Sequence, residues 1–315
     1  MAFALAAFAA VLAWLAFRTQ AHSDFGSVWF GARAMLEHRD PYHLIGRGKE
    51  FEQWPLLYPA PALVAALPLV PFSERTATML FVGLSTFLLA LGATRKGWHL
   101  LPMFTTQAFV SSASLGQWSI VMTAALFFPS LAFLSVGKPQ ASIPILLATS
   151  ERVALLAAGF GVLILGAASL FIFPMWPASW LANVRAARNM TPPVAHFGGF
   201  LVLFALARWR RSEAWLLVGT ACLPQSWGWY GTLALFTIPA NLRESVLLAA
   251  VAVAGGALAA FGVPDGLSND TFLARVGAVI VLTVYLPATF LILRRPNKGE
   301  SPAWLRAFQK DIVSR

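Results

Sequence analysis

The sequence predicts an all-α membrane protein that crosses the bilayer about twelve times. Of its 315 residues, 58% are hydrophobic and only 11% are charged, whereas roughly a quarter of the residues in an ordinary soluble domain are charged. The charged residues also gather between long uncharged segments, so they cannot cover a water-facing surface. The 12 Trp and 25 Phe suit aromatic belts at two lipid interfaces. These observations exclude a soluble fold.

The predicted spans follow from the length that a helix needs to cross the hydrocarbon, about 20 apolar residues or somewhat fewer where the bilayer thins. Several spans are short or contain proline, which is tolerated where neighbouring helices or a cavity satisfy the freed backbone groups. No Lys or Arg precedes the first span, so we interpret it as a transmembrane helix and not as a signal peptide. The spans are 2–17, 56–72, 77–93, 98–114, 118–136, 139–149, 153–174, 194–207, 213–224, 228–240, 245–262 and 271–293.

The net charge of +10 is explained by the orientation of such a protein and not by a nucleic-acid partner, because most basic residues lie at the ends of apolar segments. Two basic groups, 208–211 and 243, are expected on the cytoplasmic side, with the chain turning at 223–230 on the far side. We predict one membrane domain over 1–293 and a basic cytoplasmic tail over 294–315. Five cations of that tail are suited to attract anionic lipid headgroups: Arg294, Arg295, Lys298, Arg306 and Lys310.

Counting spans backward places the first large loop, 18–55, outside the cytoplasm, against the usual bias of basic residues toward the inside. Either one short span is miscounted, or the basic residues that this count places outside bind an anionic ligand. Composition leaves both interpretations open. The cations concerned are Arg18, Arg33, Arg39, Arg47, Lys49, Arg95, Lys96 and Lys138.

The first loop begins with a predicted amphipathic helix that lies along the membrane surface. Its apolar residues recur at helical spacing, opposite Ser27, Arg33 and Glu37. We expect Ser23 or Asp24 to cap its start and the Asp40-Pro41 pair to end it. The apolar set is Phe25, Val28, Trp29, Ala32, Met35 and Leu36.

Asp24 is the strongest candidate for a functional residue. It stands where the first transmembrane helix ends and the surface helix begins, so its carboxylate can face a partly dry cavity at headgroup depth. Aspartate is also a favoured helix cap, a structural role that stabilises a helix by about 1 kcal/mol. The two roles are compatible.

Five segments in order resemble the landmarks of glycosyltransferase family 87, whose members are polytopic enzymes of the GT-C superfamily. The segments are SDFGSVWFGARAMLEHRDPY (23–42), WPLLYPAPALVAALPLVPF (54–72), LGQWSIV (115–121), GKPQ (137–140) and LPQSWGWY (223–230). The resemblance implies a GT-C-like fold, a catalytic Asp in the first extracytoplasmic loop, a polyprenyl-phosphate-sugar donor and inversion at the anomeric carbon. Asp24 matches the catalytic position.

This chemistry needs one carboxylate and at least one cation. The carboxylate takes the proton of the acceptor hydroxyl, and cations stabilise the charge that grows on the departing phosphate. No cluster of acids, HExxH spacing or phosphate-binding glycine loop occurs in the sequence, and the single Cys, Cys222, excludes a Cys-rich metal site, so we expect no metal and no cofactor.

The remaining site candidates are residues that could hold the phosphate or the sugar, and each also has a structural interpretation. A cation can snorkel to the interface, an aromatic residue can belong to the lipid belt, and His196 can fill a helix contact. Glutamine side chains can bind hydroxyls or make structural hydrogen bonds. The predicted substrate-binding residues are Lys138, Gln140, Arg33, Tyr42, Tyr58, Arg185, Arg188, His196 and Trp227, with Gln117 as a further hydroxyl ligand.

The sequence thus predicts an inverting glycosyltransferase that moves a mannose-like hexose or a pentose from a polyprenyl-phosphate carrier to a lipid or glycan acceptor. The expected location is the bacterial cytoplasmic membrane, with the active site facing outward. The alternative is a lipid-carrier flippase or a structural membrane subunit that has a transferase-like fold without catalysis.

Overall fold

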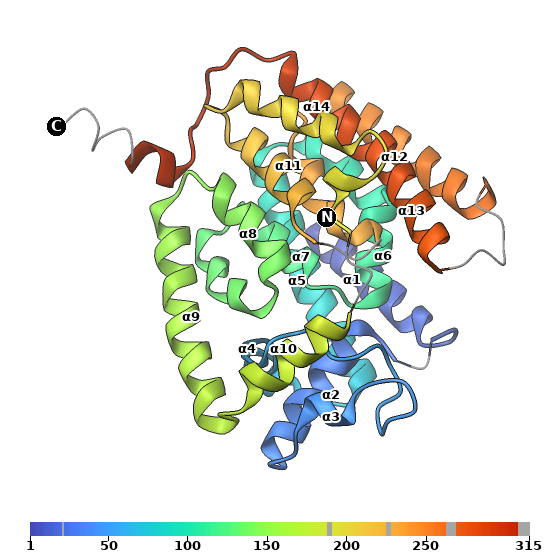
Figure 1. Ribbon diagram of the computed structural model, residues 1–315. Helices are drawn as coiled ribbons and strands as arrows, with labels where there is room; N and C mark the ends of the chain where they lie inside the picture. The colour runs from blue at the N-terminus through green and yellow to red at the C-terminus, as the bar shows by residue number, and fades with distance from the viewer. Residues whose placement is uncertain (21, 188–190, 225–227, 263–268, 308–315) are drawn as a thin grey trace. The chain divides into compact units, whose positions relative to one another are not determined.

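The structure is a computed structural model that describes residues 1–20, 22–187, 191–224, 228–262 and 269–307, without the side chains of residues 269 and 270. Across this described part the regular structure is helical (Figure 1). The β-type pairing found there is an isolated bridge between Ile45 and Phe51. The predicted all-α class is confirmed.

Four helices among the described residues are long and apolar enough to cross a membrane, as expected of a membrane protein. They are α5 (Glu74–Lys96), α9 (Arg152–Ile172), α12 (Leu242–Gly262) and the helix over Thr271–Leu293, and each coincides with a predicted span. Shorter apolar helices cover Ala2–Ala16, Ala60–Leu69, Pro139–Ala148 and Gly199–Arg208. The total of about twelve crossings and the GT-C-like fold stay predictions.

Several predicted spans contain 3₁₀ helix, namely η2 (Trp98–Thr105), η3 (Pro129–Gly137), η5 (Gly199–Arg208) and η6 (Trp229–Thr237). A 3₁₀ helix rises about 2.0 Å per residue against about 1.5 Å in an α-helix, so ten residues extend about 20 Å and not about 15 Å. Proline lies inside η2 and begins η3, where it removes a backbone donor. Short apolar segments therefore reach further than their residue number suggests.

The chain divides into two compact units, each assembled from separate segments of the sequence. Unit 1 comprises Met1–Ala90, Ser112–Ser142 and Leu156–Arg188, and unit 2 comprises Leu91–Ser111, Ile143–Leu155 and Asn189–Arg315. The predicted single domain over 1–293 stays a prediction.

The helices divide between the two units. Besides parts of α5 and α9, unit 1 contains α1 (Ala2–Ala16), α2 (Asp24–Leu36), α3 (Pro41–Leu44), α4 (Ala60–Ala66), η1 (Leu67–Leu69), the end of α6 (Gln107–Leu115), α7 (Ser119–Ala124), η3, the start of α8 (Pro139–Ala148) and α10 (Trp176–Ala186). Unit 2 contains η2, η4 (Pro193–Ala195), η5, α11 (Ser212–Cys222), η6, α12, α13 (Asn269–Ile280), the π-helical turn η7 (Val281–Tyr285) and α14 (Leu286–Leu293).

Helix α2 is the predicted amphipathic helix, and its apolar face packs inside unit 1. Phe25 stacks on Phe81 of α5, with ring centroids 4.3 Å apart. Gly31 faces α4 so closely that a Cβ atom there would lie 3.0 Å from Leu63 Cδ2. Burial against other helices accounts for the amphipathic pattern without contact with lipid, so the location of α2 at the membrane surface stays a prediction. Ser27, expected on the polar face, is buried, and its hydroxyl finds a partner there by donating to the Asp24 carbonyl oxygen at 2.7 Å.

The start of α2 agrees with the prediction, whereas its end does not. Ser23 is the cap, because its Oγ accepts a hydrogen bond from the Gly26 backbone N–H at 2.9 Å. The helix ends at Leu36, before the Asp40-Pro41 pair that was expected to end it. Asp40 caps α3 by accepting from the Tyr42 N–H at 2.8 Å. A residue before proline avoids the helical region, and a proline is well suited to the first position of a helix, so the same pair can also begin one.

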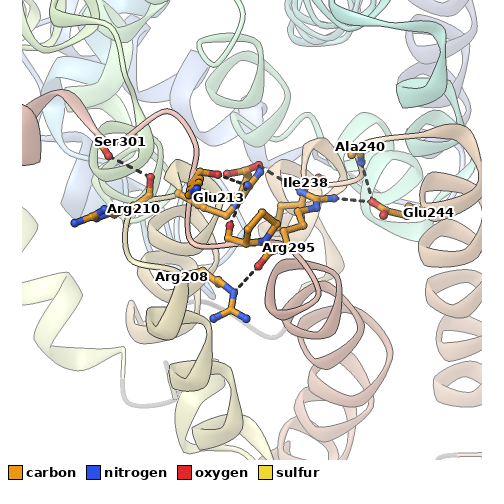
Figure 2. A network of polar contacts seen from close by, with 11 residues as sticks. Arg208, Arg210, Glu213, Ile238, Ala240, Glu244, Arg295 and Ser301 are labelled. Carbon is orange, nitrogen blue, oxygen red and sulfur yellow. Dashed lines mark hydrogen bonds and ion pairs between the residues drawn. The ribbon is translucent and has the colours of Figure 1, made fainter.

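The ends of several helices of unit 2 meet at a group of ion pairs (Figure 2). Arg295 lies at the centre, where it pairs with Glu244 at 2.6 Å and with Glu213 at 3.3 Å. Arg211 also pairs with Glu213, at 3.0 Å, and Arg208 donates to the Leu293 carbonyl oxygen at 2.8 Å. We call these five residues the Arg295 node: Arg208, Arg211, Glu213, Glu244 and Arg295.

The first part of the predicted basic tail is packed on unit 2. The Ser212 N–H donates to the Glu300 carbonyl oxygen at 3.1 Å, and the Ala303 N–H donates to the Thr149 carbonyl oxygen at 2.8 Å. Trp304 Nε1 donates to the Leu147 carbonyl oxygen at 2.9 Å. Its described residues are therefore anchored at several points. The cytoplasmic location of this segment stays a prediction.

Candidate functional site

Four polar side chains from separate segments of unit 1 form one hydrogen-bonded group. Asp24 is the first residue of α2, Tyr58 precedes α4, Gln117 lies between α6 and α7, and Lys138 lies between η3 and α8. We call this group the Asp24–Lys138 cluster. Two of its members, Asp24 and Lys138, are the base and the leading phosphate-binding candidate that the sequence predicts.

The amide of Gln117 connects the two charged residues. Its Nε2 donates to Asp24 Oδ2, and its Oε1 accepts from Lys138 Nζ. An ionised carboxylate can only accept and an ammonium can only donate, so a single amide can serve both only in this orientation. Gln117 therefore lies between an acid and a base and bonds to each.

Tyr58 completes the cluster on the side of Lys138. Lys138 Nζ lies 3.3 Å from Tyr58 Oη and 5.3 Å from the centroid of its ring. The same hydroxyl lies 3.4 Å from Gln117 Oε1. The ammonium group is thus held by an amide oxygen and a phenol, both of which are neutral.

The N-terminus of α2 fixes Asp24 in this position. Because Ser23 is the cap, the Asp24 side chain is not needed for that role and points to Gln117. Ser23 is itself held from α5, since its N–H donates to Glu74 Oε1 at 3.3 Å and its Oγ lies 3.0 Å from Thr78 Oγ1. The second Glu74 oxygen, Oε2, lies 2.8 Å from His22 Nδ1. Helix α5 therefore holds the cap Ser23 and the residue before it, His22, and so fixes the start of α2 from which Asp24 projects.

A glycine brings Gln117 close to the start of α2. Gly116 has a φ of +68°, a left-handed conformation that favours glycine. A Cβ atom there would lie 3.0 Å from Phe25 Cβ and 3.1 Å from Thr78 Cγ2. The turn between α6 and α7 can therefore approach α2 and α5 only with glycine at this position.

A second glycine allows Lys138 to approach the same place. A Cβ atom at Gly137 would lie 2.9 Å from Cζ3 of the buried Trp118, so only glycine permits this contact. Trp118 follows Gln117 in the sequence, and Lys138 follows Gly137. The close contact therefore aligns the two segments that carry the amide and the ammonium group.

Burial changes the acidity of both charged residues. Lys138 is 7% exposed and Gln117 is 1% exposed, whereas Asp24 keeps part of its surface exposed. Burial raises the pKa of Asp24, an effect that the charge of Lys138 and the hydrogen bond from Gln117 partly offset. Burial lowers the pKa of Lys138 to about 8, against the opposing effect of Asp24. The cluster thus combines an acid whose pKa is raised with a lysine whose pKa is lowered.

Tyr42 supports the cluster from outside it. Its hydroxyl donates to the Tyr58 carbonyl oxygen at 3.0 Å. Helix α10 holds the same segment, because Trp180 Nε1 donates to the Leu57 carbonyl oxygen at 2.9 Å and Asn183 Nδ2 donates to the Leu56 carbonyl oxygen at 3.2 Å. Figure 1 shows α10 beside α4. Tyr42 is therefore placed to position Tyr58.

Three other predicted substrate-binding residues of unit 1 lie outside the cluster. Arg33 is exposed and pairs with Glu37, one turn further along α2, at 3.1 Å. Arg185 is exposed on α10, and Gln140 is partly exposed on α8. The fold does not bring these three residues into the hydrogen-bonded group around Asp24.

The last three candidates are outside unit 1 or outside the described residues. His196 belongs to unit 2, where it packs on α13: a Cβ atom at Gly277 would lie 2.5 Å from the His196 ring. This contact fits its structural interpretation. Arg188 and Trp227 lie outside the described residues.

Gln117 is the member of the cluster whose partners the sequence did not predict. The sequence allows it to bind hydroxyls or to make structural hydrogen bonds, and the structure shows hydrogen bonds of the second kind, to Asp24 and Lys138. The available signal was a polar amide after a glycine within an otherwise apolar stretch. That signal shows that the amide needs a partner but cannot show which one.

Searching the described residues for metal sites finds no group of three or more His, Cys, Asp or Glu side chains. Comparison of the chain with protein-family models, curated proteins and solved structures finds no match. The assignment to glycosyltransferase family 87 therefore stays a prediction from the five sequence segments.

Proposed function

We propose that the protein is an inverting glycosyltransferase that uses a polyprenyl-phosphate sugar as donor and Asp24 as general base. The observation that carries this proposal is the convergence of Asp24 and Lys138 on Gln117, from positions far apart in the sequence. A carboxylate and a cation close together are the two groups that such a transfer needs.

In the proposed reaction, the acceptor hydroxyl oxygen attacks the anomeric carbon of the donor sugar. The new carbon–oxygen bond forms as the bond to the phosphate oxygen breaks, and the phosphate leaves with the electron pair. Asp24 takes the hydroxyl proton, and Lys138 stabilises the negative charge on the departing polyprenyl phosphate. A single displacement inverts the configuration and needs one carboxylate.

The arrangement of the cluster suits these two roles. A carboxylate with a raised pKa is a better proton acceptor than an ordinary aspartate, and the charge of Lys138 favours its ionised form. Gln117 lies between the charges, so Lys138 can stabilise a phosphate without itself bonding to the Asp24 carboxylate that must receive the proton of the acceptor hydroxyl. Substrate binding would require Lys138 to exchange part of its present hydrogen bonding for the phosphate.

The finer location belongs to the same proposal. We place the reaction at the extracytoplasmic face of a bacterial cytoplasmic membrane, with a mannose-like hexose or a pentose as the sugar and a lipid or glycan as the acceptor. The support is that Asp24 and Lys138, which the span count places on the same side, are in one cluster.

The test is transfer from a radiolabelled polyprenyl-phosphate mannose or pentose to a membrane lipid extract, catalysed by the purified full chain. A general base contributes about 10²- to 10⁴-fold to the rate, so we expect Asp24→Asn to lower turnover by that factor. Asp40→Asn is the matched control, because Asp40 caps α3 and asparagine is an equally good cap.

Retained turnover in folded Asp24→Asn protein contradicts the assignment of the base. Liposome assays distinguish the alternative, since a flippase moves labelled carrier across the bilayer without an acceptor. Carrier movement without any transfer product would replace the proposed enzyme by that alternative.

A further inference from the structure

A second polar region surrounds the Arg295 node of unit 2, whose contacts are drawn in Figure 2. Glu213 is paired with Arg211 and Arg295, and Glu244 is paired with Arg295. Both carboxylates of the node are therefore already paired with arginines inside it.

Four exposed cations lie directly next to residues of the node. Arg210 precedes Arg211, Arg243 precedes Glu244, Arg294 precedes Arg295, and Lys298 offers its carbonyl oxygen to Arg211 at 2.6 Å. In the described part of the chain, none of the four reaches a carboxylate within ion-pair distance. We call these four residues the basic rim: Arg210, Arg243, Arg294 and Lys298.

Two residues of the basic rim lie at the ends of helices that can span a membrane. Arg243 is in the first turn of α12, and Arg294 directly follows α14. The same helices expose large apolar side chains, with Leu247 55% exposed and Phe290 60% exposed. A helix with an exposed apolar surface contacts acyl chains, so its end lies at the depth of the lipid phosphates.

Two of the rim residues lie over aromatic rings. The Arg294 guanidinium is 5.5 Å from the Phe290 ring centroid, and that of Arg210 is 5.0 Å from the Trp209 ring centroid. Such stacking occupies the face of the guanidinium plane and leaves its edge N–H groups available to an anion. Aromatic and arginine side chains together are typical of the headgroup region.

We propose that the basic rim binds the phosphate groups of anionic phospholipids. The structure changes the set of lipid-binding cations that the sequence predicts. It excludes Arg295, which is only 12% exposed and is paired with two carboxylates. It adds Arg210 and Arg243, which come from other segments of the chain. The node connects the ends of η5, α11, α12 and α14, and so holds the residues of the rim near one another. Because Glu213 and Glu244 are paired inside the node, they do not compete with a lipid phosphate for the rim cations. This proposal is independent of the proposed glycosyl transfer.

The test measures lipid binding to the full chain purified in detergent. The protein is titrated with phosphatidylglycerol and with phosphatidylcholine, and bound lipid is counted by native mass spectrometry. We expect the wild-type protein to prefer phosphatidylglycerol and the variant R210Q/R243Q/R294Q/K298Q to lose that preference, by roughly five-fold for each cation removed, from about 1 kcal/mol per cation near an anionic surface. Added salt should weaken the preference as well.

Arg47→Gln is the matched control, since Arg47 is an exposed arginine over an aromatic ring, Trp54, at 4.7 Å, but belongs to unit 1. Its preference for phosphatidylglycerol should equal that of the wild type. If the quadruple variant does not fold, Arg243→Gln alone should still reduce the preference by roughly five-fold. Equal binding of the two lipids by the wild type overturns the proposal. Displacement of bound phosphatidylglycerol by inorganic phosphate at matched ionic strength also overturns it, because it would indicate a site for the free ion.

Discussion

The Asp24–Lys138 cluster of unit 1 and the Arg295 node of unit 2 both hold charged groups among helix ends, but they connect their charges differently. In the node, arginines contact carboxylates directly, at 2.6 Å for Arg295 and Glu244. In the cluster, a neutral amide lies between the acid and the base. The node therefore satisfies its charges within the protein, whereas the cluster keeps a carboxylate that can still accept a proton.

The difference also appears in what each region holds together. The Arg295 side chain bonds to Glu213, Glu244 and the Ile238 carbonyl oxygen, so one residue joins the ends of α11, α12 and η6. In the cluster, by contrast, the hydrogen bond from Gln117 goes to one of the two carboxylate oxygens of Asp24, Oδ2. A network whose carboxylates are already paired with arginines is suited to structure, and a network whose carboxylate can still accept a proton is suited to chemistry.

The largest expected effect in this comparison is that of Lys138→Met on turnover. Loss of the cation removes the charge that stabilises the leaving phosphate, and it also raises the pKa of Asp24 further, which lowers the fraction of ionised base. We expect turnover to fall at least about 100-fold, measured in the transfer assay. Lys138→Arg should keep more activity than Lys138→Met. Equal loss in both variants would mean that geometry and not charge is the requirement.

Arg295→Met should mainly affect stability, because Arg295 is 12% exposed and its loss leaves Glu244 without its partner. We expect the free energy of unfolding to fall by about 3 kcal/mol, measured by denaturant titration in detergent. The neighbouring Arg294→Met variant is the control and should cost little, since that residue is exposed. A small cost for Arg295→Met would show that the node is not the structural counterpart of the cluster.

Gln117→Met should change the pH dependence of turnover. The hydrogen bond from Gln117 lowers the pKa of Asp24, so its removal raises that pKa. Asp24 acts when ionised, and the acidic limb of the rate profile should therefore move to higher pH. Turnover measured from pH 4 to 9 checks this. An unchanged or lower limb would be incompatible with Asp24 as the base.

The smallest expected effect is that of Ser23→Ala, which removes the cap of α2. A lost serine cap costs about 1 kcal/mol of stability, measured by thermal unfolding. Ser23→Thr keeps the capping hydroxyl and should lie between the wild type and Ser23→Ala. If Ser23→Ala has no effect on stability, the Glu74 carboxylate is sufficient by itself to stabilise the start of α2, and the serine cap is not needed.

Sequence reasoning was most successful where the signal is local. The apolar segments 77–93, 153–174, 245–262 and 271–293 all proved to be long helices, and Ser23 was one of two expected caps. It failed at the end of α2, because the Asp40-Pro41 pair is equally compatible with a helix start. It also grouped Arg33 with Lys138, although Arg33 pairs with Glu37 on the surface.

The sequence by itself determined that this is a helical membrane protein and that Asp24 and Lys138 are polar residues in need of partners, because hydropathy and helical spacing are properties of neighbouring residues. Only the tertiary structure decided which residues meet. The left-handed Gly116 and the small Gly137 bring Gln117 and Lys138 to Asp24, and the path of the chain withdraws Arg295 from the surface. Contacts between distant segments depend on how whole helices pack, and this packing is not encoded in any one stretch of the sequence.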